Sequence, residues 1–396
     1  MHKILFYNAK LILKDKITRG AVAIVDNTIA CVIETESINL VEFSDYDHED
    51  LAGKYIAPGF IDIHVHGGGG FDFMDGTIEA FQTIASTHAK YGTTAMVPTT
   101  LTTTTERLIA TLQAFNQIVD QSYTGARLLG MHLEGPYFAK TQRGAQDPRY
   151  IRDPNPDEYI PLLQQYKSIV RWSLAPELSG ALEMGKYLES IGVLSAIAHT
   201  DAVYEDVIDA HKVGFRLMTH FYSAMSGVSR KNAFRYAGVI EAGYLIDDFH
   251  VEIIADGIHL PAPLLQLIYK VKGKDKMILI TDAMRATGTT VDTSILGSKE
   301  DGLEVLIEDG VAKLIDRSAF AGSIATTNRL VKTMLNLTDI PLVEIIQMLT
   351  LNPAKMMNVD DRFGTLESGK LADLVVFDDN IEIHKTIING HIVYSK

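Results

Sequence analysis

The chain has 396 residues, 46% of them hydrophobic, so it can bury a large core and is too long for one small domain. Its 36 basic and 50 acidic side chains give a net charge of −14 without any basic block, which argues against nucleic acid or an anionic membrane as a partner. A single cysteine excludes an internal disulfide, and the sequence shows neither a secretion signal nor an apolar run long enough to span a bilayer. We therefore expect a cytoplasmic enzyme.

Both ends of the chain are predicted to be rich in β-strands. Residues 21–33 form two apolar runs separated by Asp26-Asn27, which is a hairpin turn signal, and the C-terminal segment has a similar signal at Asn389-Gly390. Neither end contains enough strands for a stable sheet of its own. We therefore expect residues 1–56 and 356–396 to pair into one small β-sandwich domain.

Between the two ends, the sequence alternates between strand-like and helix-compatible segments. The strand-like runs are 60–66, 93–99, 127–134, 170–177, 193–200, 215–221, 251–257 and 277–283. Helix-compatible segments that separate them include 78–91, 103–121, 179–190, 202–212 and 261–272. This alternation predicts an α/β fold with a parallel sheet, and eight strands predict a (β/α)8 TIM-like barrel over residues 57–355. A strand-like insertion at 291–320 precedes a helix near 325–340.

Several of these runs end on side chains that can bind a metal ion. The residues concerned are His64, His66, Glu134, His199, His220 and Asp282. In a barrel of parallel strands the carboxyl ends of all strands meet at one rim, so these side chains are expected to converge. Histidines together with two carboxylates predict a site for a divalent metal.

The individual residues also allow less specific interpretations. His64 and His66 are two apart on a strand and face the same way, yet such a pair alone could be two tolerated strand histidines. Glu134 would cost several kcal/mol if it were buried without a partner, and a structural ion pair is the alternative to a metal. Asp282 could bind the metal and also accept a proton from water.

The chain resembles the amidohydrolase superfamily and, within it, the N-acetylglucosamine-6-phosphate deacetylase branch. The matching strings, in the order of that branch, are PGFIDIHVHG (58–67), HLEGPY (132–137), AHT (198–200), THFYSAM (219–225), IADGIH (254–259), TDA (281–283) and AGS (321–323). The resemblance implies a barrel with an end sandwich, one or two divalent ions per chain, and usually a homodimer. Zinc and iron both suit such ligands.

The same resemblance implies roles for particular residues. Glu134, His199 and His220 correspond to the common metal ligands, whereas His64 and His66 correspond to the additional pair found in members that hold two metals. Asp282 corresponds to the catalytic acid and base. The residues implied in substrate binding are Ala145, Gln146, Ser223, Ala224, Arg230, Arg235, His259, Phe320, Ala321 and Gly322.

Substrate recognition is where this chain departs from the branch. The branch commonly has Asn at the position of Ser223 and His at that of Gln146, and Met284-Arg285 is also atypical. In the branch an arginine, often from a partner subunit, reaches the substrate phosphate. Two residues here could correspond to it, because Arg230 fits by motif and Arg235 fits by its spacing back from His259. The sequence therefore predicts amide hydrolysis and leaves the identity of the sugar open.

The predicted function is metal-dependent hydrolysis of the acetamide of an N-acetylated amino sugar phosphate, giving glucosamine 6-phosphate and acetate from N-acetylglucosamine 6-phosphate. Alternatives are a deacetylase for another N-acetyl amino sugar, a cyclic amidase, an aminoacylase, or a non-catalytic scaffold. Many barrel amidases use a carboxylated lysine at the end of the fourth strand, but residues 170–177 contain no lysine. The sequence retains every expected ligand, which argues against a scaffold.

Overall fold

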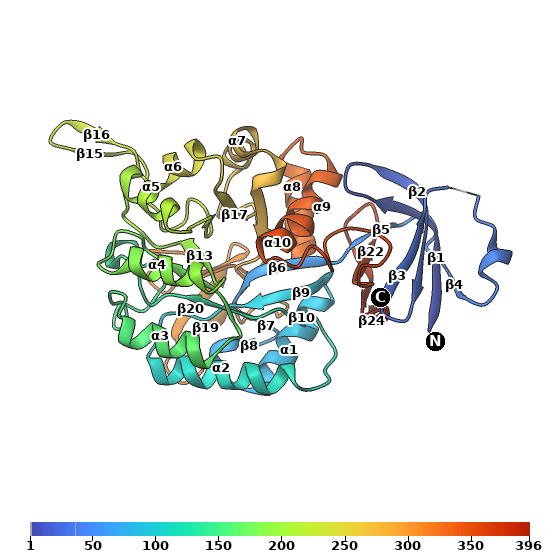
Figure 1. Cartoon of the computed structure of the whole chain (residues 1–396), viewed down its shortest axis with the longest axis horizontal. Coiled ribbons are helices and arrows are strands. Elements are labelled where there is room, and N and C mark those ends of the chain that lie inside the picture. The colour runs from blue at the N-terminus through green and yellow to red at the C-terminus, as the bar shows by residue number, and fades with distance from the viewer. Residues whose placement is uncertain (1, 36) are drawn as a thin grey trace.

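The two ends of the chain form one sheet at one end of the molecule, where both termini lie (Figure 1). The computed structural model describes residues 2–35 and 37–396. The strands of this sheet are β1 (Lys3–Ile12), β2 (Ile17–Val25), β3 (Thr28–Ile33), β4 (Asp47–Asp50), β5 (Tyr55–Pro58), β22 (Leu374–Phe377), β23 (Ile383–Ile388) and β24 (His391–Ser395). The order is β24-β23-β22-β5-β1-β2-β3, with β4 beside β1. Antiparallel pairing of β22 with β5 joins the two ends into one sheet, to which the N-terminal segment contributes five strands and the C-terminal segment three.

Parallel strands make up the larger part of the molecule, so the predicted α/β class is confirmed. These strands are β6 (Phe60–Val65), β9 (Thr93–Pro98), β10 (Arg127–Leu128), β11 (Met131–Glu134), β12 (Ile169–Leu174), β13 (Leu194–Ile197), β14 (Leu217–Met218), β17 (His250–Ile254) and β18 (Met277–Ile280). They form two ladders, β10-β9-β6 and β11-β12-β13-β14-β17-β18. Single parallel bridges, Thr99 to His132 and Val65 to Ala283, connect the ladders at both seams.

The connecting helices follow the predicted segments with a few additions. The helices are α1 (Ile78–Ala89), α2 (Thr105–Val119), α3 (Pro156–Gln165), α4 (Ala181–Ser190), α5 (Tyr204–Lys212), α6 (Val239–Leu245), α7 (Ala262–Lys272), α8 (Thr327–Leu337), α9 (Leu342–Leu349) and α10 (Leu351–Met356). The sequence interpretation did not identify α3, which contains Pro161, the seven-residue α6, or the last two helices, α9 and α10. None of the described helices combines the length and apolar character needed to cross a membrane.

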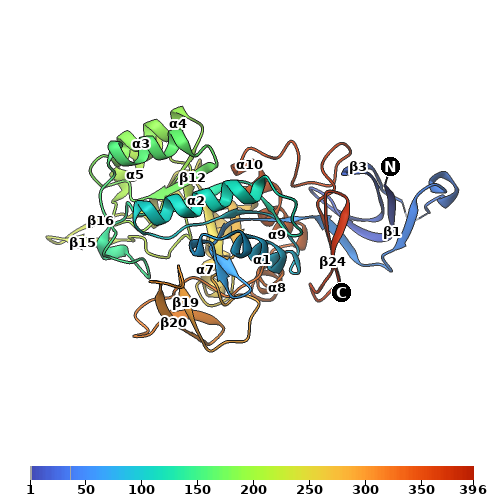
Figure 2. The ribbon, with the colours of Figure 1, turned by 90° about the horizontal axis from the view of Figure 1, so that it is seen from below.

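Short antiparallel elements decorate the parallel strands. An insertion after β18 forms a three-stranded sheet of β19 (Thr293–Leu296), β20 (Leu303–Glu308) and β21 (Val311–Leu314), which we call the flap sheet (Figure 2). A hairpin of β15 (Ser229–Lys231) and β16 (Phe234–Tyr236) projects from the molecule at the end opposite the termini (Figure 1). The smallest pair is β7 (Gly67–Gly68) with β8 (Phe71–Asp72).

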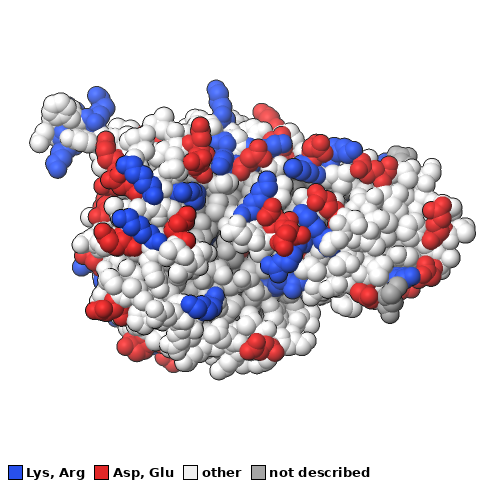
Figure 3. Space-filling model, viewed as in Figure 1, with Lys and Arg blue, Asp and Glu red and all other residues white. Residues whose placement is uncertain are grey.

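The parallel strands are fixed by packing on both faces. One cluster of fully buried side chains includes Ile61, Ile63, Val97, Leu217 and Ile278, which come from four different strands. A larger cluster lies between these strands and the helices around them. The two clusters hold the carboxyl ends of the strands on a rigid support, which is what a site built from several strands requires. On the surface, acidic and basic side chains are intermixed over the face shown in Figure 3.

Candidate functional site

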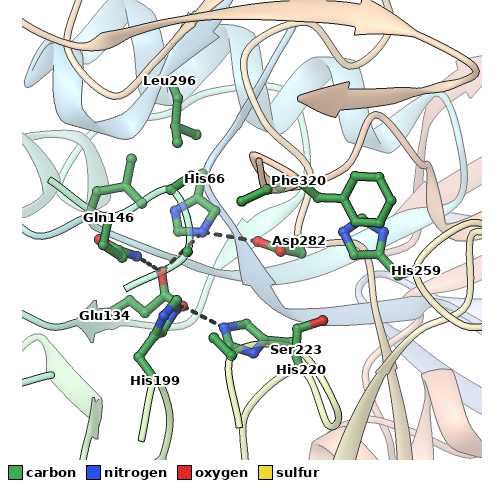
Figure 4. Close-up of a pocket in the computed structure, with 16 residues that line it drawn as sticks. His66, Glu134, Gln146, His199, His220, Ser223, His259, Asp282, Leu296 and Phe320 are labelled. Carbon is green, nitrogen blue, oxygen red and sulfur yellow. Dashed lines mark hydrogen bonds and ion pairs between the residues drawn. The ribbon is translucent and has the colours of Figure 1, made fainter. Parts of the chain in front are cut away.

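The carboxylate of Glu134, at the end of β11, lies at the centre of a cluster of imidazoles (Figure 4). Its Oε1 lies 3.0 Å from His220 Nε2, 3.4 Å from His199 Nε2 and 3.6 Å from His64 Nε2. Its Oε2 lies 3.4 Å from His66 Nε2. All five side chains are buried, so strand ends far apart in the sequence converge on one carboxylate.

Asp282 extends the cluster on the side of His66. Its Oδ1 lies 3.1 Å from His66 Nε2 and 3.5 Å from His64 Nε2, and the two imidazole Nε2 atoms lie 3.2 Å apart. Burial alone would raise the pKa of the Asp282 carboxyl, but the nearby imidazoles of His64 and His66 outweigh burial and lower it. Asp282 is therefore a charged carboxylate at neutral pH.

Three of the imidazoles are oriented by hydrogen bonds from the opposite ring nitrogen. The Nδ1–H groups of His199 and His66 donate to the carbonyl oxygens of Gln142 (2.8 Å) and Thr99 (3.3 Å). His64 Nδ1 donates to Glu252 Oε2 (3.4 Å). With Nδ1 protonated, each Nε2 lone pair faces the Glu134 carboxylate. Such an arrangement is stable only when a proton or a cation lies between them.

Two groups of donors satisfy the spacing of a metal site: His64, His66 and Glu134, and Glu134, His199 and His220, each with ligand atoms within 4.8 Å of one another. Two ligands about 2.1 Å from one ion at the tetrahedral angle lie about 3.4 Å apart. The donor separations here are close to that value, so the residues fit a divalent ion. Without an ion a proton takes this place. Burial lowers the pKa of His66, but its bond to Asp282 and the charge of Glu134 outweigh burial and raise that pKa to about 9.

The strain of the backbone marks the same positions. His199, His220 and Asp282 have φ values of 46°, 31° and 49°, in the left-handed region that residues other than glycine rarely adopt. Each of them follows the end of a parallel strand. Such strain persists only where the surrounding structure imposes it, and it concentrates at functional sites.

A buried ion pair supports the cluster from below. Arg171 on β12 donates through both of its terminal nitrogens to Glu252 on β17, with its NH2 2.9 Å from Oε2, and both side chains are fully buried. Arg171 also donates to the Ile63 carbonyl (3.0 Å). Glu252 in turn accepts from His64 and from the backbone N–H of His220 (3.4 Å). The sequence interpretation missed both residues, although a charged side chain inside an apolar strand was a usable signal.

A pocket opens above the cluster, and most of the predicted residues line it (Figure 4). The predicted residues that line the pocket are His66, Glu134, Ala145, Gln146, His199, His220, Ser223, Ala224, His259, Asp282, Phe320 and Gly322. His64 lies beneath the lining, and Ala321 is buried against the flap sheet. Arg230 and Arg235 are paired across the exposed hairpin of β15 and β16 and do not reach the pocket of their own chain.

Two lining residues have partners that define their orientation. Gln146 donates from Nε2 to Glu134 Oε2 (2.7 Å) and accepts from the Thr102 backbone N–H (2.9 Å). His259 donates from Nδ1 to Asp256 (2.8 Å), and its ring lies 4.7 Å from that of Phe320. The lining also contains four residues that the sequence did not suggest: Leu101, Gly144, Leu296 and Ala319. They come from loops and from the flap sheet and belong to none of the recognised strings.

Comparisons with known proteins agree with this geometry. The model of the amidohydrolase family matches residues 55–393. The chain is 32% identical to N-acetylglucosamine-6-phosphate deacetylase of Vibrio furnissii, over 93% of this chain and 91% of that protein. It is also 32% identical to N-acetylgalactosamine-6-phosphate deacetylase of Escherichia coli O157:H7, over 86% and 88%. The crystal structure of N-acetylglucosamine-6-phosphate deacetylase from Pasteurella multocida superposes with a TM-score of 0.91 and 27% identity over the whole of both chains.

The ion pair beneath the site can be tested by comparing a single variant with a double variant. Replacing Arg171 with Met leaves the Glu252 carboxylate buried without its cation, so we expect the free energy of unfolding to fall by about 3–5 kcal/mol. Replacing both residues, in Arg171→Met with Glu252→Gln, removes the uncompensated charge and is expected to recover part of that loss. Urea denaturation of the metal-free proteins measures both. An Arg171→Met variant as stable as the parent would contradict the account.

Proposed function

Since this chain belongs to the amidohydrolase family, we propose that it is a metal-dependent deacetylase that hydrolyses the acetamide of an N-acetylated amino sugar 6-phosphate. The observation that carries the proposal is the Glu134 carboxylate shared by imidazoles next to Asp282 in one pocket. Relatives are named for both N-acetylglucosamine 6-phosphate and N-acetylgalactosamine 6-phosphate. N-acetylglucosamine 6-phosphate is the first candidate because most of the similar proteins carry that name.

Glu134, His199 and His220 are the residues that would hold one divalent ion, with zinc or iron suited to these ligands. His64 and His66 would hold a second ion together with Glu134. A divalent ion bound here polarises the amide carbonyl and lowers the pKa of a water molecule.

Asp282 supplies the proton transfers in this proposal. Its charged carboxylate accepts a proton from the attacking water, whose oxygen forms a bond to the acetyl carbon. The carboxyl group then gives that proton to the amide nitrogen as the C–N bond breaks, so acetic acid and the free amine leave and Asp282 returns to its charged form. The acetic acid then releases its remaining proton to solvent and becomes acetate. His259, whose Nδ1 donates to Asp256, lines the pocket and can accept a hydrogen bond from a substrate hydroxyl at Nε2.

Recognition of the phosphate is assigned to another copy of the chain. Among the described residues, the pocket lining contains no lysine or arginine. Arg230 and Arg235 lie on a projecting hairpin whose Phe234 is 72% exposed, which favours insertion against a partner. We infer a homodimer in which this hairpin brings one of the two arginines to the neighbouring site, where it pairs with phosphate.

We also infer a closed barrel, a β-sandwich domain and a cytoplasmic location. The bridges at both seams between the parallel ladders support one closed (β/α)8 barrel over residues 57–355. The mixed sheet of residues 1–56 and 356–396 is assigned as a small β-sandwich domain. A cytoplasmic location remains a prediction from the sequence.

Replacement of Asp282 with Asn tests its role. The amide cannot accept the proton from water, so we expect kcat to fall by about 10²–10⁴-fold or more. The fold and the binding of metal through Glu134, His199 and His220 should persist. Metal content by mass spectrometry and circular dichroism serve as controls. Near-normal turnover by Asp282→Asn would refute the assignment.

Acetate release from a panel of sugars tests the function itself. The panel contains the N-acetyl derivatives of glucosamine, galactosamine and mannosamine, each with and without 6-phosphate. We expect the highest kcat/KM with N-acetylglucosamine 6-phosphate. Arg230→Ser or Arg235→Ser should raise KM for the phosphorylated sugar and leave the KM of the unphosphorylated one unchanged. Absence of acetate release from every member of the panel would refute the proposed function.

A further inference from the structure

A thin wall separates the pocket above the metal ligands from a second, smaller cavity. Leu101, Ala145, Gln146 and Leu296 line both cavities, so they form the wall between them. On its far side the second cavity is lined by Met74, Thr102, Thr103 and Leu303, among others. Removal of a large side chain from the wall would therefore join the pocket to this second cavity.

The two ends of the main pocket differ in chemistry and in exposure. Phe320 is 40% exposed and lies against His259 at one end, whereas Leu296 is only 5% exposed. Figure 4 shows Gln146 on the opposite side of His66 from Phe320 and His259, and Leu296 above His66, away from both rings. An aromatic face beside a hydrogen-bonding imidazole suits a sugar ring, and a buried leucine suits a methyl group. The amide carbon lies between these two groups in the substrate, as the ligand cluster does in the pocket.

Leu296 is held in place by the backbone on both sides of it. Arg285 donates from Nε to the Ile295 carbonyl (3.1 Å) and from NH2 to the Gly297 carbonyl (2.5 Å). The same guanidinium forms a bidentate pair with Asp75, at 2.7 and 2.8 Å, and the Gly297 N–H donates to Asp72 (3.1 Å). The guanidinium is buried, so these bonds are shielded from solvent and fix the strand that carries Leu296.

We propose that Leu296, together with Leu101, closes the acyl end of the pocket and restricts the enzyme to short acyl groups such as acetyl. This inference rests on the proposed deacetylase function and assigns a specificity-determining role within it. Arg285 is the positioning residue that fixes the wall. A longer acyl chain would have to displace side chains of a packed cluster that also contains Met284, Val305 and Ala321.

The test compares N-acetyl, N-propionyl and N-butyryl glucosamine 6-phosphate as substrates. Leu296→Ala and Leu101→Ala join the two cavities, so we expect the ratio of kcat/KM for the butyryl compound to that for the acetyl compound to rise at least about tenfold. Leu306→Ala is the matched control, because Leu306 belongs to the flap sheet but lines neither cavity. Two wall variants are used so that misfolding of one does not decide the result.

The possible outcomes distinguish failure of the acyl-end assignment from failure of the proposed deacetylase function. A raised ratio in either wall variant with an unchanged ratio in Leu306→Ala supports the acyl-end assignment. Wild-type hydrolysis of the acetyl compound with no change of ratio in folded wall variants overturns this assignment and leaves the deacetylase function standing. If the wild type hydrolyses none of the three compounds, the proposed function fails and the acyl-end assignment fails with it.

Discussion

The site depends on one buried carboxylate, that of Glu134, whose charged neighbours are imidazoles rather than lysine or arginine side chains. Glu134 is nearly inaccessible to solvent and faces imidazoles whose protons are directed away from it, toward Gln142, Thr99 and Glu252. A charge in this position is stable only when a proton or a metal ion occupies the space between the donors. The burial of His64 and His66 and the strained backbone at His199, His220 and Asp282 serve this arrangement.

Two layers of fixed charge hold the arrangement in place. Below the ligands, Arg171 and Glu252 form a buried pair that orients His64 and supports the backbone at His220. Above them, Arg285 joins the loop after Asp282 to the strand that carries Leu296. Arg285 is three residues from Asp282, so one loop connects the Asp282 carboxylate with the wall of the pocket.

The sequence predicted those parts of the site that lie at the ends of regular strands. Runs such as 60–66 and 277–283 each contain a strand, and their terminal ligands converge because parallel strands deliver their carboxyl ends to one rim. The predicted pairing of the two ends is confirmed by β5 and β22, but its premise was wrong for the N-terminal end, which contributes five paired strands rather than too few.

Other parts could not be predicted because they depend on tertiary contacts. Leu296 enters the pocket from an insertion, and its position is set by Arg285, which carries no local signal. Gln146, expected to contact substrate, also donates to Glu134, a contact visible only in three dimensions. Arg230 and Arg235 are paired directly across one hairpin, so their positions in the fold do not show which of them would contact the phosphate.

Binding of metal by the wild type and by Glu134→Gln tests the central claim most directly. The measurement is the number of tightly bound divalent ions per chain after gel filtration, by plasma mass spectrometry. Glutamine keeps the size of the side chain and removes the charge. The account predicts at least one ion per chain in the wild type and loss of that ion in folded Glu134→Gln. A wild type without tightly bound metal, or a folded variant that binds it equally well, would contradict the account.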